Sequence, residues 1–281
     1  MPQGQKKRKL VLKKFDITSI PDDSVVVFIG KRETGKSFLV RDLLYHKQHL
    51  PIGTVVSATE GANEFYQQIV PKNFIRYEYD EAVSERVVAR QKQAVKLAKR
   101  NPSRDPRAFY LLDDCMFDNK WTRSKMIRAM FMNGRHFRIM FLITMQYALG
   151  IPPVLRSNID YIFILRDSLI QNRRRLFESY AGMFGKFELF CKVMDQCTEN
   201  YHCLVVHNNA KSNKLEDQVF WYKASPHGAF RIGHACFWAE QDANGGKDDF
   251  DTDDDDDFRD EGTIRVFRGD YNGENARRFN M

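Results

Sequence analysis

The chain has 281 residues, 43% of them hydrophobic and 13% aromatic, which is enough to bury the core of one large domain with tails. No apolar run approaches the eighteen residues of a membrane span, and the basic N-terminus lacks the apolar centre of a signal peptide, so we expect a soluble, intracellular protein. The net charge is +7, but residues 242–261 alone carry −9, so the other 261 residues carry +16. A basic charge of this size is typical of a protein that binds a polyanion, and equally of a protein that is simply soluble.

The chain begins with a basic segment. Six Lys and Arg side chains lie between Lys6 and Lys14, and little there predicts regular structure. We interpret residues 1–20 as an N-terminal arm that contacts nucleic acid, serves as a nuclear address or is simply solvated.

From Ser24 to Tyr222, short apolar runs alternate with longer stretches of helical periodicity, which is typical of an α/β protein with a mostly parallel sheet covered by helices on both faces. The predicted strands are Val25–Ile29, Thr54–Ser57, Phe74–Tyr77, Phe109–Leu112, Met140–Thr144, Tyr161–Leu165 and Cys203–His207. The predicted helices are Lys36–His46, Glu81–Lys99, Thr122–Asn133 and Asn172–Tyr180. Val205 to Tyr222 reads as two strands around the polar turn Asn208–Lys214, a C-terminal hairpin that would add antiparallel strands to the sheet edge. We therefore assign residues 21–225 to one domain.

The composition changes after Ala224, and we assign residues 226–281 to a C-terminal tail. Eight of the ten residues Asp248–Asp257 are aspartate, so the acidic segment 242–261 cannot bury a core and is predicted to be disordered. The aspartates lack the spaced glycine and glutamate of a calcium loop, which favours a self-repelling linker over a metal site. The last residues, Gly262–Met281, are either a docking segment or a plain tail. The five cysteines form no Cys-x-x-Cys pair and are expected to be reduced.

The segment Gly30 to Ser37 matches the phosphate-binding pattern G-x-x-x-x-G-K-[ST] at every fixed position. It follows the apolar strand Val25–Ile29 and opens a helix, so backbone N–H groups and the helix dipole converge where phosphates would sit. We predict that Lys36 reaches the β- and γ-phosphates of ATP and that the Ser37 hydroxyl ligates Mg²⁺. The residues predicted to bind the nucleotide are Gly30, Lys31, Arg32, Glu33, Thr34, Gly35, Lys36 and Ser37.

A second apolar strand, at residues 109–112, ends in two carboxylates. We predict that Asp113 holds Mg²⁺, directly or through water, and that Asp114 acts as the general base on the attacking water. An ordinary strand followed by an Asp-capped turn is the weaker interpretation, because the phosphate-binding loop lies about 75 residues upstream.

A third apolar strand, Met140–Thr144, is followed closely by Gln146. If this strand lies between the other two, Gln146 reaches the γ-phosphate or its water and acts as a sensor. The order and spacing of the three strands support this role, since a lone glutamine after a strand carries little information.

Basic residues outside these motifs have two interpretations. If the protein forms a ring, an arginine from a neighbouring subunit would add positive charge at the γ-phosphate. The candidates are Arg156, Arg173 and, with less support, Arg135. Each of them is equally typical of an arginine at the surface or in contact with DNA. The predicted helix from Glu81 and the residues just after it carry many basic side chains, which form either a solvated face or a surface that contacts DNA. They are Arg86, Arg90, Lys92, Lys96, Lys99, Arg100, Arg104 and Arg107.

With these three motifs in order, the sequence resembles the genome-packaging ATPases of nucleocytoplasmic large DNA viruses, the poxvirus-type branch of the FtsK–HerA superfamily. The resemblance covers about residues 20 to 225, and its more distinctive parts are the Asp113-Asp114 pair, the segment Asn133–Ile139 and the segment Pro152–Asp160. It implies a P-loop NTPase fold of the additional-strand type, ring assembly, and ATP-driven movement of double-stranded DNA into a preformed capsid. The resemblance also implies capsid or portal proteins as partners. The expected locations are the viral factories of the host cytoplasm and the virion.

Three other functions remain open. A helicase-like enzyme or DNA pump would share all three motifs, and an unwinding assay separates it from a packaging motor. A virion protein that binds ATP and DNA without turnover has no need of a water activator, so Asp114 and Gln146 argue against it. A nucleotide kinase fits the basic chain least well.

Overall fold

The structure is a computed structural model that describes residues 10–115, 121–148 and 150–244. These described residues form one compact unit. The first nine residues of the predicted arm, nearly all of the acidic segment 242–261 and the whole of Gly262–Met281 lie outside the described residues. Within the described part of the chain, no helix is both long enough and apolar enough to cross a bilayer.

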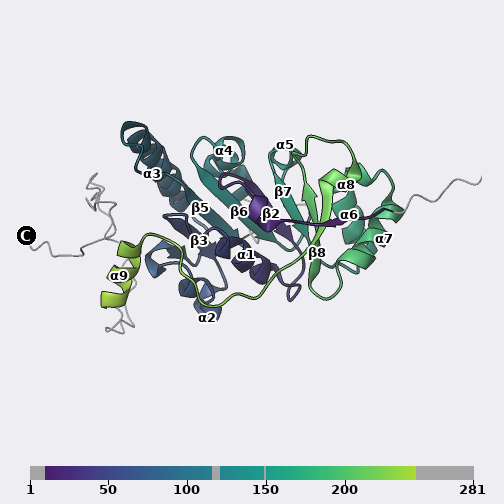
Figure 1. The fold of residues 1–281 in the computed structure, drawn as a ribbon, viewed down its shortest axis with the longest axis horizontal. Helices are drawn as coiled ribbons and strands as arrows, with labels where there is room; N and C mark the ends of the chain where they lie inside the picture. The colour runs from purple at the N-terminus through teal and green to yellow at the C-terminus, as the bar shows by residue number, and fades with distance from the viewer. Residues whose placement is uncertain (1–9, 116–120, 149, 245–281) are drawn as a thin grey trace, which may run out of the picture. The chain divides into compact units, whose positions relative to one another are not determined.

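The elements alternate along the chain as the sequence predicts. The strands are β1 (Lys13–Lys14), β2 (Val25–Ile29), β3 (Gly53–Ser57), β4 (Ile75–Arg76), β5 (Ala108–Asp113), β6 (Ile139–Met145), β7 (Tyr161–Ile164), β8 (His202–His207) and β9 (Val219–Lys223). The helices are α1 (Lys36–Tyr45), α2 (Glu60–Asn63), α3 (Glu81–Arg100), α4 (Lys125–Asn133), α5 (Pro153–Arg156), α6 (Ile170–Tyr180), α7 (Phe187–Cys197), α8 (Leu215–Gln218) and α9 (Ala235–Asn244) (Figure 1).

The strands of the described residues form one sheet, in the order β1-β9-β8-β7-β2-β6-β5-β3-β4. All neighbouring pairs are parallel except β7 with β8 and β8 with β9. The additional strand β6 therefore lies between β2, which precedes the phosphate-binding loop, and β5, which ends in Asp113. Both the predicted fold class and the antiparallel C-terminal hairpin are confirmed.

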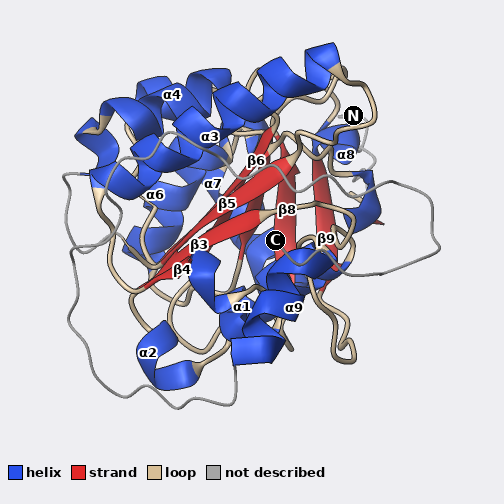
Figure 2. Ribbon diagram, turned by 90° about the vertical axis from the view of Figure 1, so that its left-hand side faces the viewer, coloured by secondary structure: helices blue, strands red, loops and turns tan. Residues whose placement is uncertain are grey.

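The central strands are buried on both faces, which is why β2, β5 and β6 read as unbroken apolar runs. Alternate residues of β2 point to opposite sides: Val25, Val27 and Ile29 pack in the core beneath α3, α4, α6 and α7, whereas Val26 and Phe28 pack in the core beneath α1. Figure 2 shows the two helical layers on either side of the strands.

The structure adds elements beyond the predicted strands and helices. The helix predicted at Thr122–Asn133 begins at Lys125, because the Ser124 hydroxyl accepts hydrogen bonds from the backbone N–H groups of Met126 and Ile127. The interval predicted as a polar turn is followed by the short helix α8. The predicted domain limits stay predictions, but regular structure extends past both of them, with β1 inside residues 1–20 and α9 inside residues 226–281.

Both edges of the sheet are short. The edge strand β1 consists of Lys13 and Lys14, both exposed, and pairs with Phe220 and Trp221 of β9. The opposite edge strand β4 is also two residues long and ends in Arg76.

Between β9 and α9 the chain crosses α1 as an extended segment, residues 224–234, which we call the C-terminal strap (Figure 1). Phe230 and Ile232 of the strap are buried in the core beneath α1. The strap is held farther along by backbone hydrogen bonds from Ile232 N to Ile69 O and from His234 N to Pro51 O, each 2.8 Å long. Residues 224–234 thus pack on the domain although the composition changes after Ala224.

Candidate nucleotide-binding site

The loop Gly30 to Ser37 connects β2 to α1 at the carboxyl edge of the sheet. Gly35, at the N-cap of α1, has φ of 99°, a left-handed value that favours glycine, and α1 has no side-chain cap. A Cβ atom on Gly30 would lie 2.6 Å from Thr34 Oγ1 and 2.8 Å from Leu165 Cβ, so a side chain there would displace the loop. The free backbone N–H groups at the start of a ten-residue helix form an anion site.

Lys36 lies back along its own loop. Its Nζ donates to Gly30 O at 2.7 Å and to Lys31 O at 2.9 Å. Burial lowers the pKa of Lys36, and the nearby carboxylates of Asp114 and Asp113 counteract this effect. The ammonium is therefore positioned between the loop and the acidic strand end, where a phosphate would meet it.

Asp113 is buried at the end of β5, between residues of the two neighbouring strands. Thr144 of β6 donates its hydroxyl to Asp113 Oδ1 at 2.6 Å, and Ser57 of β3 donates to Oδ2 at 3.1 Å. Both partners pair directly with Asp113 in the sheet register. Burial raises the pKa of Asp113, these hydrogen bonds oppose the shift, and the neighbouring charge of Asp114 adds to it. A carboxylate in this setting is stabilised by a nearby cation.

Asp114 adopts a left-handed conformation with φ of 54°, which turns the chain sharply after β5. Its backbone N–H donates to Thr144 Oγ1 at 2.9 Å, and its Oδ2 accepts a hydrogen bond from Gln146 Nε2. Thr144 therefore links Asp113 to Asp114, and Gln146 fixes the orientation of the Asp114 carboxylate.

A cleft of about 770 Å³ opens beside the loop. The loop contributes Gly35, Lys36 and Ser37, and β5 contributes Asp113. The rest of the lining, which we call the aromatic-and-strap wall, includes aromatic side chains, the end of β9 and the start of the strap: Phe38, Phe65, Tyr66, Tyr201, Lys223, Ala224 and Pro226. Phe38 is 63% exposed and Tyr201 is 67% exposed, so both present rings to solvent. The cleft combines an anion site and a metal-compatible carboxylate with apolar surface for a planar base.

Asp167, which follows β7, holds the phosphate-binding loop through its side chain. It forms a 3.0 Å ion pair with Lys31 Nζ and accepts hydrogen bonds from Leu169 N and Asn172 Nδ2. Thr34 donates its hydroxyl to Lys31 O at 2.7 Å, whereas Arg32 and Glu33 are exposed. Lys31 thus braces the loop, while the backbone of residues 30–37 is the part suited to phosphate.

The predicted site residues come together in part. Lys36, Ser37 and Asp113 line the cleft. Asp114 and Gln146 are not among its lining residues: Asp114 is linked to Asp113 through Thr144, and Gln146 donates to Asp114 and lines a separate cavity of about 80 Å³ beside Gly30. Among the arginine candidates, Arg173 is 12% exposed and pairs with Asp195 at 2.7 Å. Arg135 pairs with Asp160, and Arg156 lies 5.7 Å above the ring of Tyr180. Their predicted roles toward a neighbouring subunit stay predictions.

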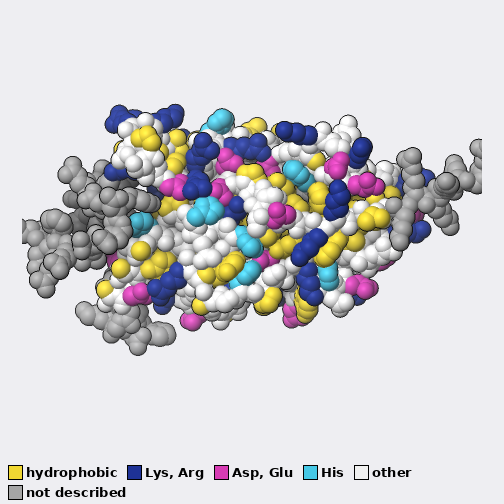
Figure 3. All heavy atoms as spheres, viewed as in Figure 1, with side chains coloured by type: hydrophobic (Ala, Val, Ile, Leu, Met, Phe, Trp, Pro, Cys, Tyr) yellow, Lys and Arg dark blue, Asp and Glu magenta, His cyan; other side chains and the backbone are white. Residues whose placement is uncertain are grey.

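The predicted basic face of α3 is smaller than its sequence indicates. Arg90 is enclosed between α3 and β3, where burial lowers its pKa to about 10, and Arg107 pairs with Asp105 and Asp22. The side chains that stay exposed are Arg86, Lys92, Lys96, Lys99 and Arg100. On the face that Figure 3 shows, Lys and Arg are interspersed with Asp and Glu instead of forming one continuous patch.

Several site residues escaped the sequence analysis. Ser57 and Thr144 are the last polar residues of buried strands, and their position opposite the strand end at Asp113 is a signal that could have identified them. Tyr201 and the strap residues follow no motif, since only the fold brings them to the loop.

Comparison with known proteins identifies viral relatives, although no protein-family model matches the chain. The chain is 40% identical over 221 residues to uncharacterized protein L437 of Acanthamoeba polyphaga mimivirus, covering 77% of this chain and 78% of the relative. It is also 40% identical over 202 residues to uncharacterized protein 088R of Invertebrate iridescent virus 3, covering 72% and 76% of the two chains.

Among solved structures, the fold matches the genome packaging NTPase B204 from Sulfolobus turreted icosahedral virus 2. The complex of B204 with sulfate gives a TM-score of 0.52 at 16% identity, covering 74% of this chain and 100% of B204. Its complex with AMPPCP gives 0.51 at 15% identity, covering 73% and 100%. The viral relatives and the NTPase fold thus confirm the resemblance that the motifs predict.

Proposed function

The chain belongs to the family of large-DNA-virus proteins represented by mimivirus L437 and the iridescent virus protein 088R, and on this premise we propose that it is the ATPase that drives double-stranded viral DNA into a preformed capsid. The observation that carries the proposal is the chain of hydrogen bonds through Thr144, which links Asp113 to Asp114 beside the phosphate-binding loop. A protein that only bound nucleotide would need the loop, but not a second, separately oriented carboxylate.

The loop holds the phosphates of ATP. Its backbone N–H groups and Lys36 would contact the phosphate oxygens, and the ammonium of Lys36 would exchange its bonds to Gly30 O and Lys31 O for bonds to phosphate. The donors near Asp113 fit Mg²⁺, because a hydroxyl and a carboxylate are oxygen ligands of the kind it prefers. Ser37 and Asp113 would hold the ion, which supplies charge neutralisation at the phosphates.

Asp114 performs the proton transfer. A water that attacks the γ-phosphorus gives up a proton to the Asp114 carboxylate, and the bond to the leaving oxygen of ADP breaks. Gln146 holds Asp114 Oδ2, so it sets the direction in which the carboxylate accepts that proton. A shift of the γ-phosphate after hydrolysis would change the contacts of Gln146, which is how a sensor reports the nucleotide state.

The proposal includes three partners: double-stranded DNA, further copies of this chain in a ring, and the capsid. The net charge of +16 outside residues 242–261 supports binding to a polyanion, and the fold shared with the genome packaging NTPase B204 supports a role in DNA packaging. We place the protein in the host cytoplasm at the site of virion assembly, as a homo-oligomeric ring that engages capsid or portal proteins. Arg156 remains the candidate for the arginine donated between subunits, because Arg173 is enclosed by its contacts with Asp195 and Asp167.

The test is ATP turnover by the full chain with and without long linear duplex DNA, across a salt series. We expect stimulation that is independent of sequence and a DNA-binding constant that falls roughly 10³-fold between 50 and 200 mM salt. Absence of stimulation at every salt concentration and assembly state would contradict the motor. Strand separation in an unwinding assay would replace it with a helicase.

A further inference from the structure

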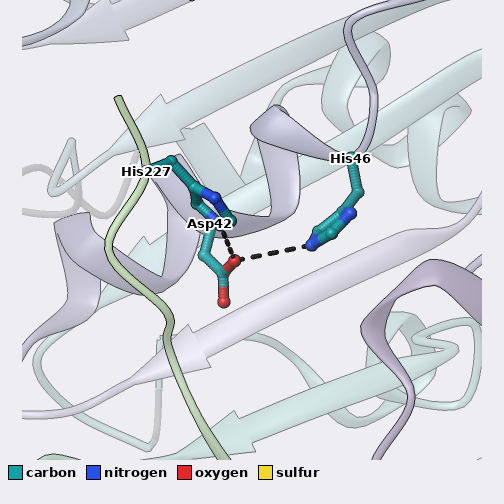
Figure 4. Close-up of side chains that lie close together, drawn as sticks. All are labelled: Asp42, His46 and His227. Carbon is teal, nitrogen blue, oxygen red and sulfur yellow. Dashed lines mark hydrogen bonds and ion pairs between the residues drawn. The ribbon is translucent and has the colours of Figure 1, made fainter. Parts of the chain in front are cut away.

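A second group of chemically distinctive side chains lies on α1, away from the loop. Asp42 and His46 are four residues apart on one face of the helix, and His227 reaches them from the strap (Figure 4). Each of the three residues offers one ligand atom, and these atoms lie within 4.8 Å of one another. His227 Nε2 is 2.5 Å from Asp42 Oδ1, and His46 Nε2 is 3.6 Å from the same oxygen.

Asp42 is a buried carboxylate that accepts hydrogen bonds but forms no ion pair with a Lys or Arg of the described residues. Among those residues its ion-pair partners are the two histidines. A buried carboxylate is costly unless a positive charge or several hydrogen bonds compensate it. Neutral imidazoles supply no charge, whereas a cation bound between Oδ1 and the two Nε2 atoms does.

The surroundings of Asp42 resemble the outer shell of a metal ligand. The second carboxylate oxygen, Oδ2, accepts hydrogen bonds from Tyr222 Oη at 2.6 Å and from Ser225 N at 3.2 Å, which fixes the plane of the carboxylate and leaves Oδ1 facing the histidines. The ring of His227 stacks on Tyr45 at a centroid separation of 3.7 Å and an interplanar angle of 8°, so its orientation is also fixed.

We propose that Asp42, His46 and His227 form a binding site for a divalent transition-metal ion, zinc above all, that fastens the C-terminal strap to α1. Two imidazoles and one carboxylate are a ligand set that zinc accepts, and tetrahedral coordination places ligand atoms about 3.3 Å apart, which these side chains reach through small adjustments. The His46 side chain is 28% exposed, so water has access to the fourth position.

The site connects two parts of the molecule that line the cleft beside the phosphate-binding loop. The helix α1 begins with Lys36 and Ser37, and the strap residues directly before His227, Ala224 and Pro226, line the cleft. A metal ion that joins His227 to α1 therefore fixes the aromatic-and-strap wall of the cleft relative to the phosphate-binding loop. The inference concerns residues outside the proposed catalytic set and does not depend on ATP hydrolysis.

The experiment is a Zn²⁺ titration of the full chain after removal of metal with EDTA, in competition with a chromogenic chelator. We expect one tight site per chain. H46Q and H227Q should each weaken it on the order of 10²-fold, and Tyr222→Phe about tenfold, because it removes a hydrogen bond that orients Asp42. His49→Gln is the matched control, since His49 is an exposed histidine just beyond α1 that contacts Asp22 instead of Asp42.

A competing zinc site is distinguishable. His234 Nδ1 lies 3.0 Å from Cys236 Sγ, so the titration is repeated with Cys236→Ser, and the Co²⁺ complex is examined for thiolate charge-transfer absorption. Unchanged binding in Cys236→Ser and a cobalt spectrum without that absorption support the proposal. Equal zinc affinity in wild type, H46Q and H227Q overturns it, as does a wild type that binds no zinc. Because H46Q alters a partly exposed side chain, it keeps the test valid if H227Q fails to fold.

Discussion

The two walls of the cleft differ in how they are built. One wall, Glu33, Gly35, Lys36 and Ser37 with Asp113, is formed where parallel strands end, and its residues are close in sequence to the strands that hold them. The other wall combines Tyr201 with the start of the strap, segments that lie more than 160 residues after the loop in the sequence and that only the fold brings beside it. We therefore expect the wall with motifs to carry out ATP hydrolysis and the other wall to contribute affinity for the nucleotide.

The largest effect should come from Lys36→Ala, in the wall with motifs. Losing the ammonium that meets the phosphates should lower ATP turnover on the order of 10²-fold or more while the fold is kept, because Lys36 packs in neither core. Steady-state ATPase assays and circular dichroism check both parts. The control is Lys192→Ala, an exposed lysine on α7. Near-normal turnover in a folded Lys36→Ala protein would falsify the phosphate assignment.

Asp114→Asn should separate binding from hydrolysis. The amide keeps the shape but cannot accept a proton from water, so turnover should fall about 10²-fold while a fluorescent ATP analogue still binds. Asp113→Asn, by contrast, should also weaken the dependence of binding on Mg²⁺. If Asp114→Asn hydrolyses ATP normally and Asp113→Asn does not, the base lies elsewhere.

Tyr201→Ala tests the wall without motifs. Removing a ring that is 67% exposed at the cleft should raise KM about tenfold and leave kcat nearly unchanged, because the ring contacts the ground state and transition state equally. Tyr77→Ala is the control, since Tyr77 is 57% exposed and lies outside the cleft lining. A fall in kcat with unchanged KM would show that this wall takes part in the chemistry.

The smallest effect concerns stability without nucleotide. Burial raises the pKa of Asp113 in the folded protein, so the folded state holds its proton more tightly than the unfolded chain, and the ionised carboxylate destabilises the fold at pH above that raised value. Asp113→Asn should therefore raise Tm by on the order of 3 °C near pH 8, and the gain should shrink as the pH falls through the raised pKa. Thermal denaturation across pH measures it, with the exposed Glu85→Gln as control. A gain that is independent of pH would exclude the carboxylate as its source.

Much of the fold could be predicted because its central strands are apolar on both faces. The pattern predicted β2 at its observed bounds, and it located β5 and β6 to within one residue at each end. The helix α7 was missed although its sequence contains the signal, since Val193 and Met194 follow Phe190 by three and four residues and all three are buried.

Other elements carried no local signal. The strand β1 is two exposed lysines that become a strand only by pairing with β9, and the strap is held by Ile69 and Pro51, far away in the sequence. In the site, the motif predicted Lys36, Ser37 and Asp113, each fixed by its distance from a strand end. Tyr201 has a left-handed φ of 62° and reaches the cleft through tertiary packing, which no spacing rule describes.

The short outer strands of the sheet have a consequence for how copies of this chain can associate. Long, flat outer strands offer rows of unpaired N–H and C=O groups that recruit strands from other molecules. Here β1 offers two residues with exposed lysines, and β4 offers two residues ending in Arg76, so both sides resist continuation into an intermolecular sheet. Association between copies is therefore expected to use side-chain surfaces, which can separate and rejoin during a working cycle, instead of a shared ladder of backbone hydrogen bonds.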